Sequence, residues 1–485
     1  MPKLSFKKIK KYIKDNKIII VIFLVAFILR LSFVLGVDIE PNIGDDETYI
    51  KAAKYMLGEN EFKGCSLRLP GYPLFLSTLQ ILFGSMIIPA QIIQVFLSSI
   101  TSIIIYLIGK ESFNKRVGLI AAVFFVFYPL LVIYNEYILS ESLFIFLLSL
   151  SIYFLVLLLK RDFSIKYSVL AGFLLAFAVL TRSITLIFCI FIPLVFLIYN
   201  RGSLKEKIWS LLIIVVIVAS LSSLQILRNY NNWDIIAFDM YSGQNFWIGN
   251  NINATGKYPK YDLNFRDMGP FKNISYEKRN RLGFRLGLEF IKQHSNKFKE
   301  LLINKIKLFW TFQEKDWHPK LTNTFIISKV SHPLYKLLRL IAVIGIILTL
   351  PKWRDFFLLY CVIFTFWIGT SLFFIGNRFR LPIIPFLIVF AGSVINRIKL
   401  RWFSSIINKI KLWLDIKKNI ILLYKLTIMM GGVLLVSLLI KRVADPYTLD
   451  GVCDPCVMVI RRILLFMMIG ISLLIINFFR KRKPY

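Results

Sequence analysis

The sequence predicts an all-α protein that crosses a membrane many times. Of its 485 residues, 57% are hydrophobic and the mean hydropathy is +0.67, so polar residues are too few to cover a water-facing globule of this size. Apolar runs long enough to span a bilayer recur along the whole chain and give about twelve candidate helices. Basic blocks separate these runs, as is typical of cytoplasmic loops.

The positive charge follows the predicted spans. The chain carries 61 Lys and Arg against 27 acidic residues, a net charge of +34 that in a soluble protein would suggest a nucleic-acid partner. Here the basic blocks sit between apolar runs, where the positive-inside rule accounts for them. We therefore expect membrane lipids, and no nucleic acid, as partners.

The first span is expected at residues 18–36, and this run is long enough to stay in the membrane as an anchor. The later spans are expected at 87–109, 117–134, 142–159, 167–181, 183–199, 209–227, 334–351, 356–375, 381–396, 419–440 and 457–479. The shorter run Gly71–Gly84 is different, because the basic loops fall on one side of the membrane only if it does not cross. We expect a juxtamembrane or re-entrant helix there, within the first outer loop.

These spans divide the chain into six parts. They are a basic cytoplasmic tail at 1–17, an N-terminal transmembrane module at 18–227 with its first outer loop at 37–86, an extracytoplasmic loop domain at 228–333, further transmembrane helices at 334–396, a basic cytoplasmic loop at 397–418, and C-terminal helices with a basic tail at 419–485. The protein is expected in the cell membrane, with both termini in the cytoplasm and the site on the extracytoplasmic side. The loop domain is expected to be mixed, irregular or short-stranded at first and then amphipathic and helical.

Three acids, Asp45-Asp46-Glu47, follow the first span directly. Carboxylates beside lipid are costly, so three in a row indicate hydrogen bonding, a cationic partner, a metal or solvent exposure. A carboxylate is also the natural general base for sugar transfer, because it removes the proton of the attacking hydroxyl. Alternatively, these acids only favour the positive end of a helix that starts here, with Asp45 as its cap.

Four arginines lie at the ends of spans on the face that holds these acids: Arg68, Arg182, Arg378 and Arg380. Taken singly, an arginine at a helix end usually extends to the interface. Together they predict a site for a leaving phosphate, whose growing charge needs fork-like donors. Glu141 begins a span from the same side, either as a helix cap or as a second acid in the site.

Other chemistry is weakly supported. The histidines, His294, His318 and His332, have no metal-ligand spacing, and Cys453 and Cys456 favour a disulfide or two free thiols over zinc. No phosphate-cradling glycine-rich loop, nucleophile elbow or dinucleotide fingerprint is present. We assign no cofactor, although a divalent cation beside the carboxylates stays possible.

In their order along the chain, these motifs resemble the GT-C glycosyltransferases that take sugars from polyprenyl-phosphate donors, a group that includes protein O-mannosyltransferases and lipid A aminoarabinose transferases. The resemblance covers roughly residues 18–395. It rests on Asp46-Glu47-Thr48-Tyr49, on Arg68 with Pro70-Gly71-Tyr72-Pro73, on Ser140-Glu141, on Leu180-Thr181-Arg182 and on Arg378-Phe379-Arg380-Leu381-Pro382. An acid that some relatives place just before the proline-rich element is missing beside Arg68.

The resemblance implies an inverting membrane transferase that acts on the outer face, with a lipid, glycan or protein as acceptor. It implies Asp46 as the catalytic base with Glu47 and Glu141 in support, and Arg68, Arg182, Arg378 and Arg380 as ligands of the donor phosphate. Tyr49, Pro70, Gly71, Tyr72 and Pro73 would shape the site, and the helices at 334–396 would complete it.

Three alternatives stay open at this stage. A lipid-linked sugar flippase or other transporter would line a path with charges, although such folds commonly have internal repeats, and none is evident. A polymerase or ligase of the O-antigen type differs only in donor and product. A non-catalytic assembly protein would need no acid cluster.

Overall fold

The computed structural model describes residues 17–36, 45–59, 67–161, 163–258, 269–272, 274–311 and 330–398. All of them belong to the first of two compact units, Met1–Ile410. The last two predicted spans, the basic loop beyond residue 398, the cysteine pair Cys453 and Cys456, and His318 lie outside the described residues.

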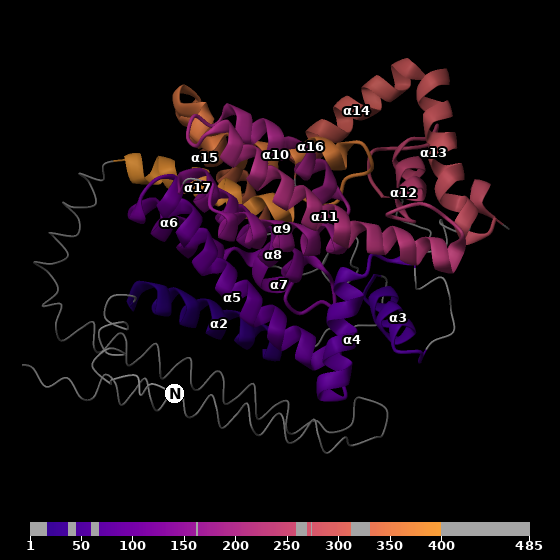
Figure 1. Ribbon diagram of the computed structural model, residues 1–485, viewed down its shortest axis with the longest axis horizontal. Coiled ribbons are helices and arrows are strands. Elements are labelled where there is room, and N and C mark those ends of the chain that lie inside the picture. The colour runs from indigo at the N-terminus through magenta and orange to yellow at the C-terminus, as the bar shows by residue number, and fades with distance from the viewer. Residues whose placement is uncertain are drawn as a thin grey trace, which may run out of the picture. The chain divides into compact units, whose positions relative to one another are not determined.

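The predicted all-α class is confirmed (Figure 1). The helices are α2 (Lys17–Gly36), α3 (Asp45–Met56), α4 (Gly71–Phe83), α5 (Ile87–Ser112), α6 (Lys115–Phe127), α7 (Pro129–Ile133), α8 (Glu141–Lys160), α9 (Ile165–Thr181), α10 (Ile184–Ile198), α11 (Leu204–Trp233), α12 (Ser242–Gly249), α13 (Tyr276–Gln293), α14 (Ser295–Phe309), α15 (His332–Thr349), α16 (Trp353–Ser371) and α17 (Ile384–Arg397), with short 3-10 turns η2 (Gly269–Phe271), η4 (Leu350–Lys352) and η5 (Asn377–Ile383). Within the described ranges, β structure is limited to one isolated bridge between Lys257 and Ile375.

The protein is a multi-pass membrane protein. Six described segments are long and apolar enough to cross a bilayer: Ile18–Gly36, Ile87–Ser112, Glu141–Lys160, Leu204–Trp233, His332–Ser371 and Asn377–Arg397. The segment His332–Ser371 consists of α15 and α16 joined by η4, so it contains two of the predicted spans. The spans predicted at 167–181 and 183–199 form the shorter apolar helices α9 and α10. Gly71–Phe83 is likewise a short apolar helix, and it ends at Gly84 in the left-handed region.

The span predicted at 117–134 is broken in two, because Pro129 has no N–H to continue the helical ladder. Arg30 of α2 supplies the missing donors: its Nη2 donates to the Phe125 carbonyl at 3.1 Å and its Nη1 to the Val126 carbonyl at 3.2 Å. Its Nε donates to Ser98 Oγ at 2.8 Å. The buried Arg30 therefore ties α2 to α6 and α5, and its place inside an apolar run gave no sign of this role.

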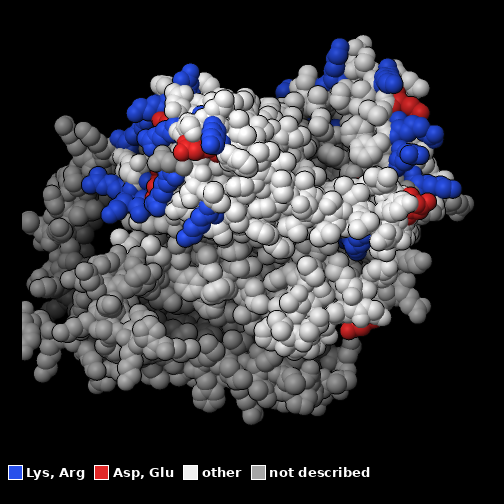
Figure 2. Space-filling view, viewed as in Figure 1, with Lys and Arg blue, Asp and Glu red and all other residues white. Residues whose placement is uncertain are grey.

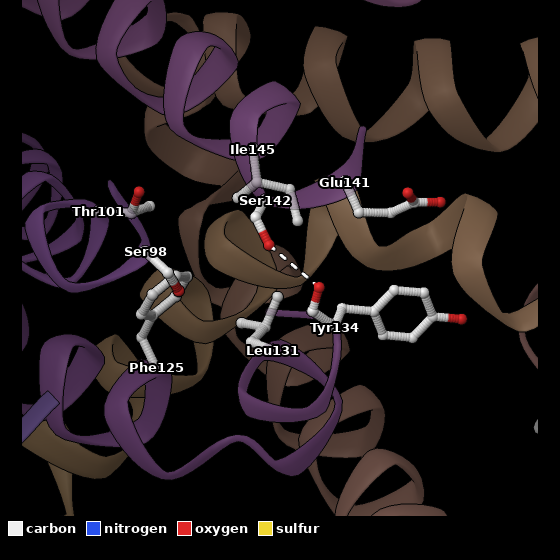
Figure 3. A pocket seen from close by; sticks show the side chains of 8 residues that line it. All are labelled: Ser98, Thr101, Phe125, Leu131, Tyr134, Glu141, Ser142 and Ile145. Atoms are coloured by element: carbon white, nitrogen blue, oxygen red, sulfur yellow. Dashed lines mark hydrogen bonds between the residues drawn. The ribbon is translucent and has the colours of Figure 1, made fainter. Parts of the chain in front are cut away.

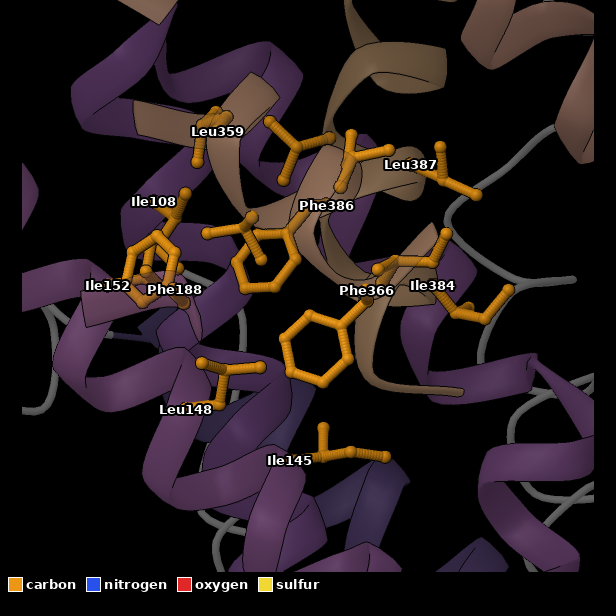
Figure 4. Close-up of a cluster of buried hydrophobic side chains, with 14 of the residues drawn as sticks. Ile108, Ile145, Leu148, Ile152, Phe188, Leu359, Phe366, Ile384, Phe386 and Leu387 are labelled. Atoms are coloured by element: carbon orange, nitrogen blue, oxygen red, sulfur yellow. The ribbon is translucent and has the colours of Figure 1, made fainter. Parts of the chain in front are cut away.

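The main core is formed by apolar side chains of α5, α8, α10, α16 and α17 (Figure 4). In Figure 4, side chains such as Ile108, Leu148 and Phe366 face one another from different helices. Other apolar side chains face outward; Ile190 of α10 is 73% exposed and Ile81 of α4 is 72% exposed. Such exposure suits contact with lipid tails, which are as apolar as the side chains themselves.

Figure 2 shows where the charged side chains lie. Lys and Arg gather near α6, α15 and α17 and along α13 and α14, and a broad face between the two groups carries neither. A face without charge between two charged regions is the pattern expected of a chain embedded in a bilayer.

Two smaller packing units position the site. α3 and α4 lie side by side (Figure 1) around a buried cluster that includes Ala53, Tyr72 and Leu76. α12 packs closely on α13: a Cβ at Gly243 would lie 1.9 Å from the Asn280 carbonyl oxygen, so this contact requires glycine.

Candidate active site

A cavity of about 590 Å³ opens where α3, α8, α9, α10, α12, α13, α16 and η5 meet. A volume of this size suits a small ligand or a lipid headgroup with part of its chain. The charged residues of its described lining are three acids and three arginines, namely Asp45, Glu141, Asp239, Arg68, Arg182 and Arg378. The opposing charges balance, and they come from segments far apart in the sequence.

Asp45, the first residue of α3, holds two of the arginines. Arg68 Nη2 lies 2.5 Å from Asp45 Oδ1, and Arg378 Nη2 lies 2.5 Å from Asp45 Oδ2. Arg68 Nη2 also donates to Thr48 Oγ1 at 2.7 Å, and its guanidinium lies 4.8 Å from the Tyr49 ring centroid. A carboxylate that bridges two guanidinium groups fixes both side chains at the cavity wall.

Arg182 and Glu141 form the next part of the wall. Arg182 Nη2 lies 2.5 Å from Glu141 Oε1, and Arg182 Nε donates to Ser140 Oγ at 3.2 Å. The ion pair is close, yet among the described residues neither carboxylate oxygen of Glu141 takes a hydrogen bond of good geometry. Both oxygens therefore keep acceptor capacity for a ligand.

A small void of about 10 Å³ lies behind Glu141, with Ser98, Thr101 and Ser142 in its lining (Figure 3). In this view the Glu141 carboxylate and the Tyr134 ring point away from the other residues that line the void. Glu141 also lines the large cavity. Its charge thus belongs to the large cavity.

Asp46 lies behind this wall. It is 1% exposed, and neither of its carboxylate oxygens has a hydrogen-bond partner among the described residues. The pKa of Asp46 is raised to about 8, mainly by burial and also by the negative charges of Asp45 and Glu141, while Arg378 opposes the rise. Asp46 is not among the residues that line the cavity, whereas Asp45 is.

Two other predicted residues also lie away from the cavity. Glu47 is half exposed and pairs with Lys51 of the next helical turn at 2.5 Å. Arg380 is buried and donates through Nη1 to the carbonyl oxygens of Phe309 and Thr311, at 2.9 and 2.6 Å. The guanidinium of Arg380 thus joins η5 to the end of α14.

The residues predicted to shape the site connect α3, α4, α5, α8 and α9. The Tyr49 hydroxyl donates to Ser140 Oγ at 3.3 Å, and the Tyr72 hydroxyl donates to Gln94 Oε1 at 2.7 Å. Pro70 precedes α4 and Pro73 is buried in its first turn. Gly71 lies against α9, where a Cβ would be 2.6 Å from Thr181 Oγ1. The start of α4 therefore supports the segment that carries Arg182.

Sequence reasoning missed the contribution of the loop domain. Asp239, Asn245 and Asn280 line the same cavity from the loop after α11, from α12 and from α13. Asp239 Oδ2 accepts from Ser183 Oγ at 2.6 Å, and its Oδ1 accepts from the Tyr241 N–H at 2.9 Å. Their setting in a polar, Asn-rich loop gave no signal beyond composition.

Apolar side chains complete the cavity. Most are aromatic and come from α13, α16 and the segment before α17: Phe284, Phe366, Phe373, Phe374 and Phe379. Ile184 and Ile187 of α10 face the same space. Among the described residues, no group of three or more His, Cys, Asp or Glu side chains is arranged to hold a metal ion.

Part of the chain matches a known protein family. Residues 68–224 match the family model of the dolichyl-phosphate-mannose-protein mannosyltransferases. No curated protein sequence matches the chain significantly.

Solved structures of similar fold come from the oligosaccharyltransferase of Archaeoglobus fulgidus. Its apo form has a TM-score of 0.51 at 15% identity, with 81% of this chain and 52% of that chain covered. The form tethered to an acceptor peptide has a TM-score of 0.50 at 13% identity, with 88% and 56% covered. This chain therefore spans about half the length of those proteins, and the likeness concerns the fold. The predicted resemblance is confirmed: the chain has a GT-C-like fold, and its segment 68–224 matches the dolichyl-phosphate-mannose-protein mannosyltransferase family.

Proposed function

We propose that the protein is a membrane glycosyltransferase that moves a sugar from a polyprenyl-phosphate donor to an acceptor hydroxyl at the extracytoplasmic face. The observation that carries this proposal is the cavity in which three arginines and three carboxylates meet beside an aromatic wall. The family match supports it, because the name of that family specifies a lipid-phosphate mannose donor. The acceptor is a lipid, a glycan or a protein.

The arginines are proposed to bind the donor phosphate. Arg68, Arg182 and Arg378 line the cavity, and each guanidinium forms an ion pair with a carboxylate there. A guanidinium that binds a carboxylate has the geometry to bind a phosphate, which supports this role. The acceptor oxygen attacks the anomeric carbon while the bond from that carbon to the phosphate oxygen breaks. The bond's electron pair leaves with polyprenyl phosphate, where the guanidinium groups stabilise the added charge. A single displacement of this kind inverts the anomeric carbon.

The proton of the acceptor hydroxyl goes to a carboxylate of the acid triplet. We assign this role to Asp46, because the ionised form of an unpaired carboxyl with a pKa of about 8 is a stronger base than a carboxylate held by two arginines, and part of it is ionised near neutral pH. A second assignment, Asp45, is favoured by its place in the cavity lining. In that case donor phosphate would draw Arg68 and Arg378 from Asp45 and so strengthen it as a base.

The test is sugar transfer from radiolabelled decaprenyl-phosphate mannose by the protein in lipid nanodiscs, for wild type, Asp45→Asn and Asp46→Asn. Loss of a general base lowers kcat by about 10²–10⁴-fold with donor binding retained, so the variant that shows this loss identifies the base. Glu289→Gln, an exposed acid of α13, is the matched control. Wild-type protein that binds donor but never consumes it would favour a transporter.

A further inference from the structure

The loop domain contributes a polar wall to the cavity that the chemistry above leaves unused. Asp239, Ser242, Asn245, Tyr258 and Asn280 all line the cavity, and among them only Asp239 carries a charge at neutral pH. The four neutral side chains bring no positive charge to balance a phosphate, unlike the arginines that line the same cavity. They are the donors and acceptors that suit hydroxyl groups.

Asn245 has an acceptor that nothing in the described chain satisfies. Its Oδ1 is fully buried and has no hydrogen-bond partner among the described residues, although the residue lines the cavity. α12 holds its backbone in place, because the Asn245 N–H donates to the Tyr241 carbonyl at 3.0 Å. A buried amide oxygen without a donor is unfavourable, so its position indicates a ligand that brings a donor.

Asn280 provides the complementary donor. Its Oδ1 accepts from the Gly243 N–H at 2.7 Å, which fixes the orientation of the side-chain amide. Among the described residues nothing accepts a hydrogen bond from its Nδ2 group, which remains as a donor for the cavity. Because Gly243 brings α12 and α13 into close contact, Asn245 and Asn280 are held on one rigid surface.

Asp239 joins this surface to the arginines. Its carboxylate accepts from Ser183, the residue after Arg182, and from the N–H of Tyr241, whose ring centroid lies 5.3 Å from the Arg68 guanidinium. Within the described residues each Asp239 carboxylate oxygen accepts one hydrogen bond and keeps further acceptor capacity. The polar wall therefore begins where the proposed phosphate site ends.

We propose that Asp239, Asn245 and Asn280 bind the hydroxyl groups of the sugar that is transferred, a neutral hexose carried on the donor phosphate. This inference rests on the proposed function. Each sugar hydroxyl both donates and accepts a hydrogen bond, so an acceptor on Asn245, a donor on Asn280 and a carboxylate on Asp239 match adjacent hydroxyls. The anomeric carbon is bonded to the phosphate oxygen, so the sugar must lie beside the arginines, where this wall lies.

The test separates the sugar from the phosphate. Dissociation constants are measured for farnesyl phosphate and for farnesyl-phosphate mannose with the full-length protein in nanodiscs. Wild type is expected to bind the mannosylated ligand several-fold more tightly. Asn245→Ala is expected to raise Kd for that ligand about five- to tenfold and to leave Kd for farnesyl phosphate unchanged, as the loss of one hydrogen bond requires. Asn253→Ala, an exposed asparagine of the same domain outside the cavity lining, is the matched control.

Several results would overturn the inference. Equal affinity of wild type for the two ligands would do so without any variant, and so would an Asn245→Ala protein that binds both ligands as wild type does. Unchanged Kd for both ligands with slower transfer would assign the wall to the acceptor. If Asn245→Ala misfolds, Asn245→Ser is measured in the same way. If wild type binds neither ligand, the proposed donor is wrong and this inference falls with it.

Discussion

Asp46 is buried without a hydrogen-bond partner in the described chain, so its negative charge is costly in the folded protein. Its pKa is about 8 in the fold and about 4 in an unfolded chain. Between these values the unfolded carboxyl is ionised while the folded one holds its proton, so the folded state binds more protons. Stability from this residue therefore falls as pH rises from about 4 to 8, and then levels off.

Asp46→Asn removes this dependence. Relative to wild type, the variant is expected to gain stability steadily between pH 5 and pH 8, by at most about 1.4 kcal/mol per pH unit. Thermal unfolding midpoints of the two detergent-solubilised proteins at pH 5, 6.5 and 8 measure the difference. The comparison cancels the titration of other residues. A gap that stays constant with pH would mean that the Asp46 carboxyl ionises normally.

Arg378 and Arg380 are two residues apart in sequence and are expected to fail in different ways. Arg378→Ala removes a guanidinium from the cavity and should weaken binding of farnesyl phosphate while the protein stays folded. Arg380→Ala leaves the carbonyl oxygens of Phe309 and Thr311 without this donor, so it should destabilise the fold by on the order of 3 kcal/mol. Ligand affinity and unfolding midpoint are measured for both. Equal effects of the two variants on affinity would mean that Arg380 also binds the phosphate, as first predicted.

At the scale of helices, the contact between α4 and α9 sets the position of Arg182. A Cβ on Gly71 would lie 2.6 Å from Thr181 Oγ1 and 2.8 Å from the Thr181 backbone nitrogen. Gly71→Ala must therefore separate the two helices and move the residue after Thr181. Because small displacements of a positioning group are costly in catalysis, kcat is expected to fall on the order of tenfold or more. Thr78→Ala, at an exposed position of α4, is the control.

The helices were predictable because apolar runs report burial or lipid contact directly, and most predicted spans coincide with described helices. The break at Pro129 was not recognised, because the apolar run continues through it and its rescue by Arg30 depends on another helix. For the site, the types of residue were predictable but their pairing was not. Asp45 and Arg378 are 333 positions apart, and no local pattern specifies which acid meets which arginine.

The loop domain marks the limit of sequence reasoning. Asn245 and Asn280 act through α12–α13 packing, which depends on the close contact at Gly243, and an asparagine in a polar loop is otherwise unremarkable. The same holds for Asp239, whose position follows from its bonds to Ser183 and Tyr241. Residues of this kind are found from tertiary contacts.

For the whole molecule, we predict one orientation of the chain across the bilayer. The basic loops around Lys115, Arg201 and Lys352 are predicted in the cytoplasm, and the loop domain that holds α12, α13 and α14 is predicted outside. The charged groups in Figure 2 lie on either side of a face without charged side chains, which suits one fixed orientation across the bilayer. The cavity lining draws on that loop domain, so the orientation also decides on which side the site opens.

Cysteine labelling tests this orientation in a chain whose five native cysteines are replaced by alanine. Asn253→Cys and Lys205→Cys place single thiols at exposed positions of the loop domain and of the first turn of α11. A membrane-impermeant maleimide applied to intact spheroplasts should label the first variant and should label the second only after permeabilisation. The reverse pattern would place the cavity on the cytoplasmic side, where the lipid-linked sugar would have to be bound from within the cell. Because both positions are exposed, a failure to react reports the membrane barrier rather than burial.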